Sequence, residues 1–151
     1  SFLKINHLLF FTRRFIKIVV FFYSMKEIMR DWIEQAKADL KTAKDSLTSG
    51  NYYASAFFSQ QSAEKSLKAV YIHSKGILPP KIHDLVSLGK TIGAPDSLLL
   101  LSEKLTGTYI FSRYPGAAPK IPAKFYTEEK AKNHLKEAEA IVQWAEKKTR
   151  L

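Results

Sequence analysis

The sequence predicts an all-α fold, an antiparallel up-and-down bundle of four to five helices. Apolar residues recur at i, i+3, i+4 and i+7 over long segments, which is typical of helices rather than strands. Glycine and proline mark the limits of these segments, as at Gly50, Gly76 and Pro79-Pro80. With 151 residues, the chain is long enough for one domain with a single core.

Residues 1–24 differ from the rest, because they are crowded with Phe, Leu, Ile and Val and contain no acid. Their basic residues are Lys4, Arg13, Arg14 and Lys17. These charges divide the apolar run into pieces too short for a membrane span, and the order is not that of a secretory signal. The segment is either an amphipathic arm that docks on the bundle or on a second copy, or upstream sequence before a start at Met25. We favour Met25, which makes residues 25–151 the helical bundle.

The first bundle helix is expected from about Lys26 to Ser49, with Gly50 as its stop. Its apolar stripe consists of Ile28, Trp32, Ala36, Leu40, Ala43 and Leu47. Asp39 lies beside this stripe, where we expect it to bond a neighbouring helix.

The segment from Gly50 to Gly76 predicts the central helix, because apolar and aromatic residues lie on more than one of its faces. One row is Tyr53, Phe57, Gln60, Glu64, Leu67 and Tyr71, and Ala56, Ala63, Leu67 and Val70 run beside it. The polar residues of the segment are Gln60, Gln61, Glu64, Lys65 and Lys68. Such groups need partners when buried. They form either a satisfied hydrogen-bond network between helices or the wall of a polar cleft for a phosphate or nucleotide.

His83, Asp84 and Leu85 open a short helix to about Ile92, with Asp84 favourably placed at its N-terminus. His83 either makes a capping or interhelical hydrogen bond, which we prefer, or meets a phosphate. A further helix should begin at Asp96 as its cap and carry residues 98–101 and Leu105 toward the core.

Residues 106–125 are predicted to be irregular, because they contain three prolines and two glycines. Arg113 beside Tyr114 suits phosphate binding and ring stacking, although Arg113 could equally bond Glu64 or Asp39. The last helix should begin after Thr127 as N-cap. Its buried stripe is Ala131, Leu135, Ala138, Ile141, Val142 and Ala145.

The formal net charge of +10 favours polyanions such as nucleic acid or nucleotides, or an acidic partner. The chain has no cysteine, so disulfides and thiolate metal sites are excluded and a cytoplasmic location is expected. The four histidines lack the spacing of metal ligands, and no metal site or bound cofactor is expected.

Several motifs together resemble the HEPN family, the higher eukaryotes and prokaryotes nucleotide-binding domain. From about Met25 onward the chain matches the pattern G-x-Y-x-x-A-x-F-x-x-Q-Q-x-x-E-K-x-L-K-A, followed by H-D-L and S-R-Y-P. The matching residues are Gly50, Tyr52, Ala56, Phe58, Gln60, Gln61, Glu64, Lys65, Leu67, Lys68, Ala69, His83–Leu85 and Ser112–Pro115. The resemblance implies an all-α bundle, often dimeric.

Many members of the family are ribonucleases with an R-x(4–6)-H motif. Counted from Arg113, the histidine should stand at Ala118, Pro119 or Lys120, and none of these is histidine. The resemblance therefore implies a stand-alone, non-catalytic member that is paired with a minimal nucleotidyltransferase, of which a toxin–antitoxin pair is one form, and that binds a nucleotide such as ATP. The implied nucleotide or phosphate site is Arg113, Tyr114, Lys65, Lys68, Gln61, Glu64 and His83.

Two other functions compete with this hypothesis. One is a metal-independent ribonuclease or toxin acting on RNA, in which Arg113 and His83 would be required. The other is a structural homodimer that binds no ligand, in which Glu64 and Arg113 would make only satisfied bonds.

Overall fold

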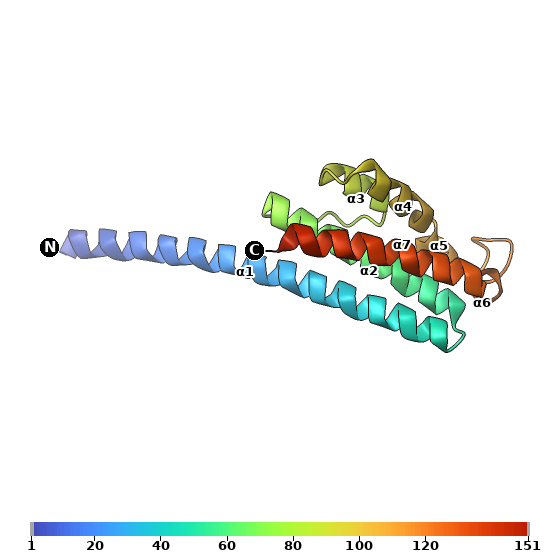
Figure 1. The fold of residues 1–151 in the computed structure, drawn as a ribbon. Helices are drawn as coiled ribbons and strands as arrows, with labels where there is room; N and C mark the ends of the chain where they lie inside the picture. The colour runs from blue at the N-terminus through green and yellow to red at the C-terminus, as the bar shows by residue number, and fades with distance from the viewer. Residues whose placement is uncertain (1, 151) are drawn as a thin grey trace.

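The computed structural model describes the backbone of residues 2–150 and the side chains of residues 24–150. Within this range the chain forms seven helices and no strand, which confirms the all-α bundle (Figure 1). The helices are α1 (Phe2–Thr48), α2 (Tyr52–Lys75), α3 (Leu85–Thr91), α4 (Asp96–Thr106), α5 (Thr108–Phe111), α6 (Pro122–Phe125) and α7 (Glu128–Thr149). The single turns α5 and α6 lie within the segment expected to be irregular.

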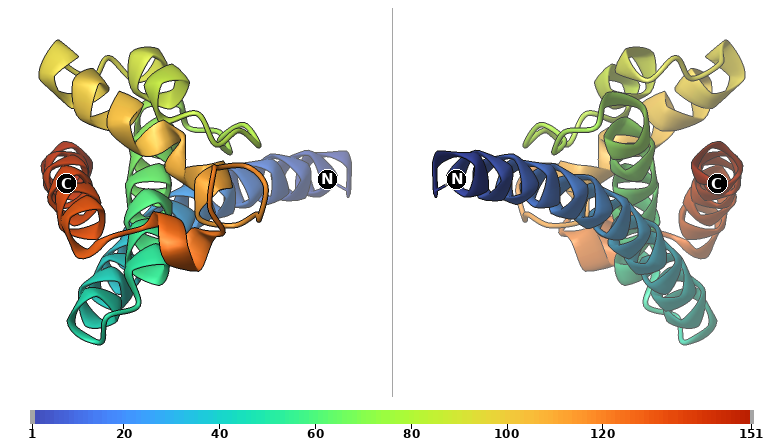
Figure 2. Two further views of the ribbon diagram at one scale, coloured as in Figure 1. Left: turned by 90° about the vertical axis from the view of Figure 1, so that its right-hand side faces the viewer. Right: turned by 90° about the vertical axis from the view of Figure 1, so that its left-hand side faces the viewer.

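Helix α2 is the centre of the bundle, as its sequence predicts. It contacts each of the other six helices in the described part of the chain, and Figure 2 shows them arranged around it. Small buried residues allow the neighbours to pack closely: Ser55, Ala56, Ser59, Ser62, Ala63 and Ser66. Helices α1, α2, α4 and α7 alternate in direction along the bundle (Figure 1).

The main core joins α2, α3, α4 and α7 through eight buried residues: Ala63, Leu67, Leu85, Leu88, Leu98, Leu105, Ala138 and Ile141. A second cluster joins α1 to the C-terminal half of α2 through Met25, Met29, Ala69 and Ile72. Each fully buried leucine stabilises the fold by roughly 1.5–3 kcal/mol relative to an exposed one. The buried stripe expected for the last helix is confirmed at all six positions.

Helix α1 begins much earlier than the expected start near Lys26. Residues 1–24 contain no glycine or proline to stop a helix, so the backbone is helical from Phe2 and passes Met25 without a break. The first half of α1 extends past the end of the bundle (Figure 1). The expected docking of this arm depends on the side chains of residues 1–23, which lie outside the described residues, and the boundary at Met25 stays a prediction.

The local signals at helix ends are mostly confirmed. Asp84 caps α3 by accepting from the backbone N–H groups of Val86 and Ser87, and Thr127 caps α7 by accepting from Lys130. The expectation that Asp96 caps α4 is wrong. Pro95 occupies the cap position, and Asp96 is the first helical residue, where its charge suits the helix dipole.

Two apolar assignments are also wrong. Leu100 is 62% exposed, because the core-facing residues of α4 follow the spacing of Leu98 and Leu105 and Leu100 lies off that face. Tyr53, in the first turn of α2, is 42% exposed, whereas neighbouring elements were expected to cover this helix on nearly every side. No helix in the described range has a stretch long and apolar enough to cross a membrane.

Candidate functional site

The polar row on α2 contains a buried ion pair. Gln60, Glu64 and Lys68 follow at i, i+4 spacing, so their side chains lie along one side of the helix. Lys68 Nζ is 2.8 Å from Glu64 Oε1, and the two side chains are only 6% and 7% exposed. Gln60 Nε2 donates to Glu64 Oε2 at 3.1 Å. Burial alone raises the pKa of the Glu64 carboxyl, but the bonds from Lys68, Gln60 and His83 outweigh burial and lower that pKa.

A second ion pair joins α2 to α1. Lys65 Nζ donates to Asp39 Oδ2, and Gln35 Nε2 donates to Asp39 Oδ1 at 2.9 Å. The prediction that Asp39 bonds a neighbouring helix is therefore confirmed. Gln61 links the two pairs, because its amide group donates to Gln60 Oε1 at 2.7 Å and its Oε1 accepts from Lys65 at 3.4 Å. Lys65 and Lys68 are therefore each paired with a carboxylate of the protein itself.

His83, in the loop before α3, connects this network to α5. Its Nδ1 is 3.1 Å from both carboxylate oxygens of Glu64, which confirms the preferred interhelical bond. An ionised carboxylate only accepts hydrogen bonds, so His83 Nδ1 is the donor in this contact. The imidazole also stacks on Tyr109, with ring centroids 3.9 Å apart and planes 12° apart.

Arg113 lies over two aromatic rings. Its Cζ is 4.3 Å from the ring centroid of Phe57 on α2 and 4.3 Å from that of Tyr109 on α5. The alternative in which Arg113 bonds Glu64 or Asp39 is not found among the described residues, where these two carboxylates are paired with lysines instead. The buried Nε of Arg113 has no hydrogen-bond partner in the described structure. With ring faces over the guanidinium, its N–H edge is the part suited to an incoming acceptor.

A hollow of about 500 Å³ opens beside Arg113. Its lining consists of Tyr53, Ala54, Phe57, Phe58, Ser112, Arg113 and Tyr114. The α2 residues form two adjacent pairs at i, i+4 spacing, so one side of the helix makes one wall. Arg113 is the only ionisable group in this lining that carries a charge at neutral pH.

The structure divides the seven predicted site residues into two groups. Gln61, Glu64, Lys65, Lys68 and His83 belong to the bonded network. Arg113 and Tyr114 line the hollow. Tyr109 connects the groups, because it contacts both His83 and Arg113. Sequence reasoning missed Tyr109, Phe57 and Tyr53. Tyr109 stands four residues before Arg113, a spacing that could have indicated it, whereas the approach of Phe57 depends on the fold.

The α5 turn is held in place by residues of α7. His134 Nε2 is 3.3 Å from Thr108 Oγ1, and His134 Nδ1 is 2.8 Å from Glu137 Oε2. Tyr126 packs edge-on against His134. Burial raises the pKa of the Tyr126 phenol, and the hydrogen bond with the Thr108 side chain only partly opposes this rise. These contacts position the turn that carries Tyr109.

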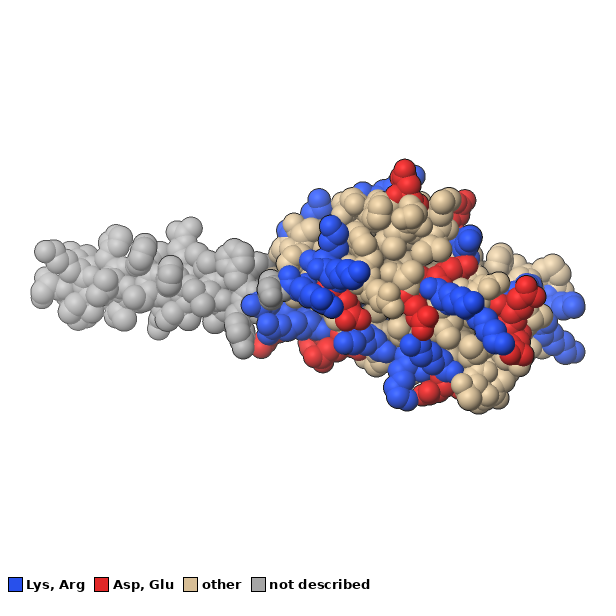
Figure 3. All heavy atoms as spheres, viewed as in Figure 1, with Lys and Arg blue, Asp and Glu red and all other residues tan. Residues whose placement is uncertain are grey.

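The charge excess is not gathered into one basic surface on the face formed by α1 and α7. Figure 3 shows Lys and Arg interspersed with Asp and Glu over this face. Two interhelical ion pairs contribute to the mixture, Lys37 with Glu146 at 3.7 Å and Lys44 with Glu139 at 2.9 Å. This face is therefore less suited to a long polyanion than the net charge suggests.

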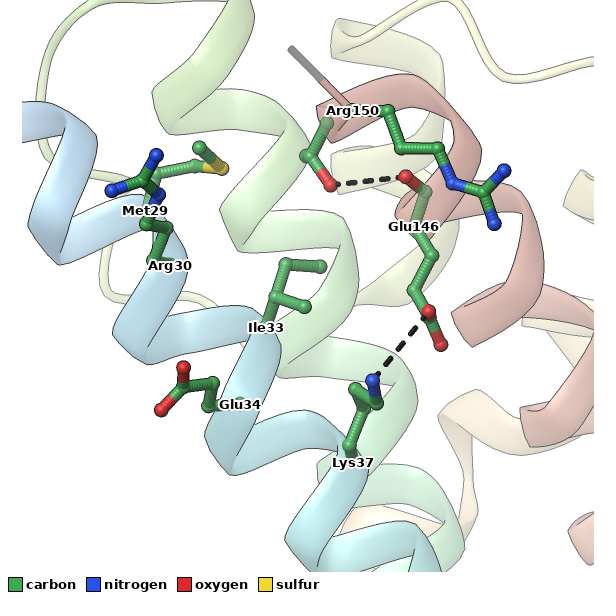
Figure 4. A pocket seen from close by; sticks show the side chains of 8 residues that line it. Met29, Arg30, Ile33, Glu34, Lys37, Glu146 and Arg150 are labelled. Atoms are coloured by element: carbon green, nitrogen blue, oxygen red, sulfur yellow. Dashed lines mark hydrogen bonds and ion pairs between the residues drawn. The ribbon is translucent and has the colours of Figure 1, made fainter.

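A second hollow, of about 440 Å³, lies between α1 and the end of α7 (Figure 4). It is lined by Met29, Arg30, Ile33, Glu34, Lys37, Glu146, Thr149 and Arg150. The ion pair between Lys37 and Glu146 spans it, and Thr149 donates its hydroxyl proton within α7. Its polar groups are thus partly paired with one another. Within the described part of the chain, no three His, Asp or Glu side chains lie close enough together to hold a metal ion.

Comparisons with known proteins agree on the family. The family model described as the HEPN domain matches residues 29–148. The structure is similar to TT1696 from Thermus thermophilus, with 33% sequence identity, a TM-score of 0.74, and coverage of 80% of this chain and 97% of that one.

Two further solved structures are similar to the chain. ST0689, an archaeal HEPN homologue, shares 31% identity with a TM-score of 0.70, covering 81% of this chain and 98% of that one. The HEPN domain protein tm0613 from Thermotoga maritima shares 25% identity with a TM-score of 0.61, covering 78% and 95%. No curated protein matches. The chain belongs to the HEPN family, and this membership supports a role connected with nucleotides or RNA.

Proposed function

We propose that this chain is a nucleotide-binding HEPN protein that has no catalytic centre of its own and acts with a minimal nucleotidyltransferase. The observation that carries the proposal is the Arg113 guanidinium, which lies over Phe57 and Tyr109 at the edge of an aromatic hollow. Its buried Nε lacks a partner in the described structure, and buried donors normally have one. Because the Nε itself is buried, a phosphate oxygen would be held by the terminal N–H groups of the same guanidinium.

The non-catalytic part of the proposal depends on the sequence. The histidine of the R-x(4–6)-H motif is replaced at each possible position, by Ala118, Pro119 and Lys120. The nearest later histidine, His134, already contacts Thr108 and Glu137 through its two ring nitrogens. The partner enzyme would then supply the chemistry.

Nucleotide titration by calorimetry tests the ligand-binding half. We expect ATP to bind in the micromolar to millimolar range and Arg113→Ala to weaken binding about tenfold or more, since each tenfold is about 1.4 kcal/mol. Arg30→Ala is the matched control, because Arg30 lines the second hollow and not the first. Absence of nucleotide binding, or a larger loss in Arg30→Ala, would contradict the assignment of the site.

The partner and the homodimer are tested separately. Four large apolar side chains between residues 110 and 121 are exposed, and they support association between copies: Ile110, Phe111, Tyr114 and Ile121. Light scattering should give twice the mass of one chain. Co-purification with a nucleotidyltransferase encoded beside this protein would support the pairing, and its absence at both low and high salt would count against it.

A ribonuclease is the second candidate, because the structure brings His83 and Arg113 to the same ring. Both contact Tyr109, and the bond from His83 Nδ1 to Glu64 resembles the carboxylate–histidine arrangement that orients a general base. Metal-free RNA cleavage that is lost in Arg113→Ala and in His83→Gln, but kept in the exposed-residue control His73→Gln, would replace the proposal by this function. If neither nucleotide binding nor RNA cleavage is observed, the results favour the third hypothesis, a structural homodimer that binds no ligand.

A further inference from the structure

The hollow beside Arg113 has walls suited to a planar ring. Tyr53 from α2 and Tyr114 from the loop after α5 both line it and are 42% and 56% exposed, so both residues are in part accessible to a ligand. Two more aromatic residues, Phe57 and Phe58, form its wall on α2 with ring centroids 5.0 Å apart. Exposed aromatic side chains of this kind stack on nucleobases. The volume of about 500 Å³ lies within the range of small-molecule sites.

Among the described residues that line the hollow, Arg113 is the only one with a positive charge at neutral pH. One phosphate can therefore meet a cation in this lining. Lys65 and Lys68 are paired with Asp39 and Glu64, and neither lysine lines the hollow. Recruiting either lysine to a polyphosphate would leave a buried carboxylate without its cation, which is costly.

We propose that this hollow binds a single nucleoside monophosphate unit, with the base against Tyr53 and Tyr114 and the phosphate on the N–H edge of Arg113. The unit is either a free mononucleotide or one residue of a single-stranded RNA. This inference rests on the proposed nucleotide-binding function and narrows it, since no second cation for the β and γ phosphates of a triphosphate is found among the described lining residues.

The identity of the base matters little in such a site. Stacking is available to every base, because each has a π face. The Ser112 hydroxyl donates its proton to the Thr108 carbonyl and is not free to donate to a base edge. The four mononucleotides should therefore bind with affinities within about tenfold of one another.

The test compares ligands by calorimetry on the full chain: AMP, ATP, adenosine, inorganic tripolyphosphate and a six-nucleotide oligoadenylate. We expect AMP and ATP to agree within about threefold and tripolyphosphate and adenosine to bind at least about tenfold more weakly than AMP. Tyr114→Leu should weaken AMP about tenfold and leave tripolyphosphate unchanged. Tyr71→Leu is the control, because Tyr71 is on α2 but does not line the hollow.

The outcomes separate the inference from the function on which it rests. ATP or tripolyphosphate binding more than about tenfold tighter than AMP, or AMP binding unaffected by Tyr114→Leu, overturns the inference while nucleotide binding stands. If none of the nucleotides or the oligoadenylate binds, the proposed function itself fails. Oligoadenylate binding at least about tenfold tighter than AMP identifies RNA as the source of the unit, and comparable affinities identify the free mononucleotide.

Discussion

Replacing Lys68 by methionine should destabilise the fold at neutral pH, because it leaves the Glu64 carboxylate buried without its cation. Both side chains are almost fully buried, and the ion pair is 2.8 Å long. Breaking a buried pair on one side costs about 3–5 kcal/mol. Gln60 and His83 still hydrogen-bond the carboxylate, so we expect a loss near the lower end, about 3 kcal/mol. Methionine has a similar length, which limits any change in packing.

The pH dependence of this loss gives a second readout. In the unmodified chain the folded-state pKa of Glu64 lies below its usual value of 4.5, so its stabilising contribution is present above pH 4.5 and is lost as the pH falls through the lowered pKa. Without Lys68, burial is the largest remaining effect on the Glu64 carboxyl, and we expect it to raise the folded-state pKa above 4.5. The Lys68→Met chain should therefore be less destabilised at about pH 5 than at about pH 7.

Urea unfolding followed by circular dichroism measures both effects. For a loss of about 3 kcal/mol and a slope of about 1–3 kcal/mol per molar urea, the midpoint should fall by about 1–3 M at neutral pH. Lys41→Met is the matched control, because Lys41 and Asp45 have the same i, i+4 spacing but side chains that are 77% and 65% exposed. A midpoint shift no larger than that of the control, or equal losses at both pH values, would refute the reasoning.

The double variant Glu64→Gln/Lys68→Met separates charge from packing. It removes both charges, so it should be more stable than Lys68→Met alone. If it is less stable by the sum of the two single losses, the ion pair is not what determines the cost.

Three further predictions concern local structure. Gly76→Ala should lower stability by about 1 kcal/mol, because Gly76 ends α2 at φ +67°, and thermal unfolding should show it. Asp84→Ala should cost about 1 kcal/mol through the loss of two cap bonds, whereas Asp96→Ala, which removes no cap bond, should cost less in the same assay. Thr108→Val should lower the melting temperature and also weaken nucleotide binding, because Thr108 holds the turn that carries Tyr109; binding that is unchanged would argue against this positioning role.

Much of the fold could be predicted from local sequence. The stripe from Ala131 to Ala145 and the caps Asp84 and Thr127 were predicted correctly, because they depend on spacing along one helix and on the nearest backbone N–H groups. The cap of α4 was predicted incorrectly. The local sequence allows the helix to begin at either of two adjacent residues, and the backbone conformation makes Pro95 the cap and Asp96 the first helical residue. The helical backbone before Met25 was also missed, although the absence of glycine and proline there indicated it.

The site was predicted less completely. The seven candidate residues were chosen by chemistry and resemblance, and the structure shows that five of them bond one another through Glu64 and its neighbours. A charge pattern cannot reveal whether Lys65 meets Asp39 on another helix, because that contact joins residues 26 positions apart. The same holds for Arg113, whose partners proved to be rings rather than carboxylates.

By itself the sequence determined the all-α class, the central position of α2, the family, and the presence of an arginine beside a tyrosine in a loop after the core helices. These properties depend on periodicity and on neighbours within one or two helical turns. Only the tertiary structure decided which of the basic site residues pair with a carboxylate. Packing α2 against α1 pairs Lys65 with Asp39. Packing α5 against α2 places Arg113 against the rings of Phe57 and Tyr109, in the lining of a hollow. Such pairings depend on distances between helices, which no local pattern in the chain encodes.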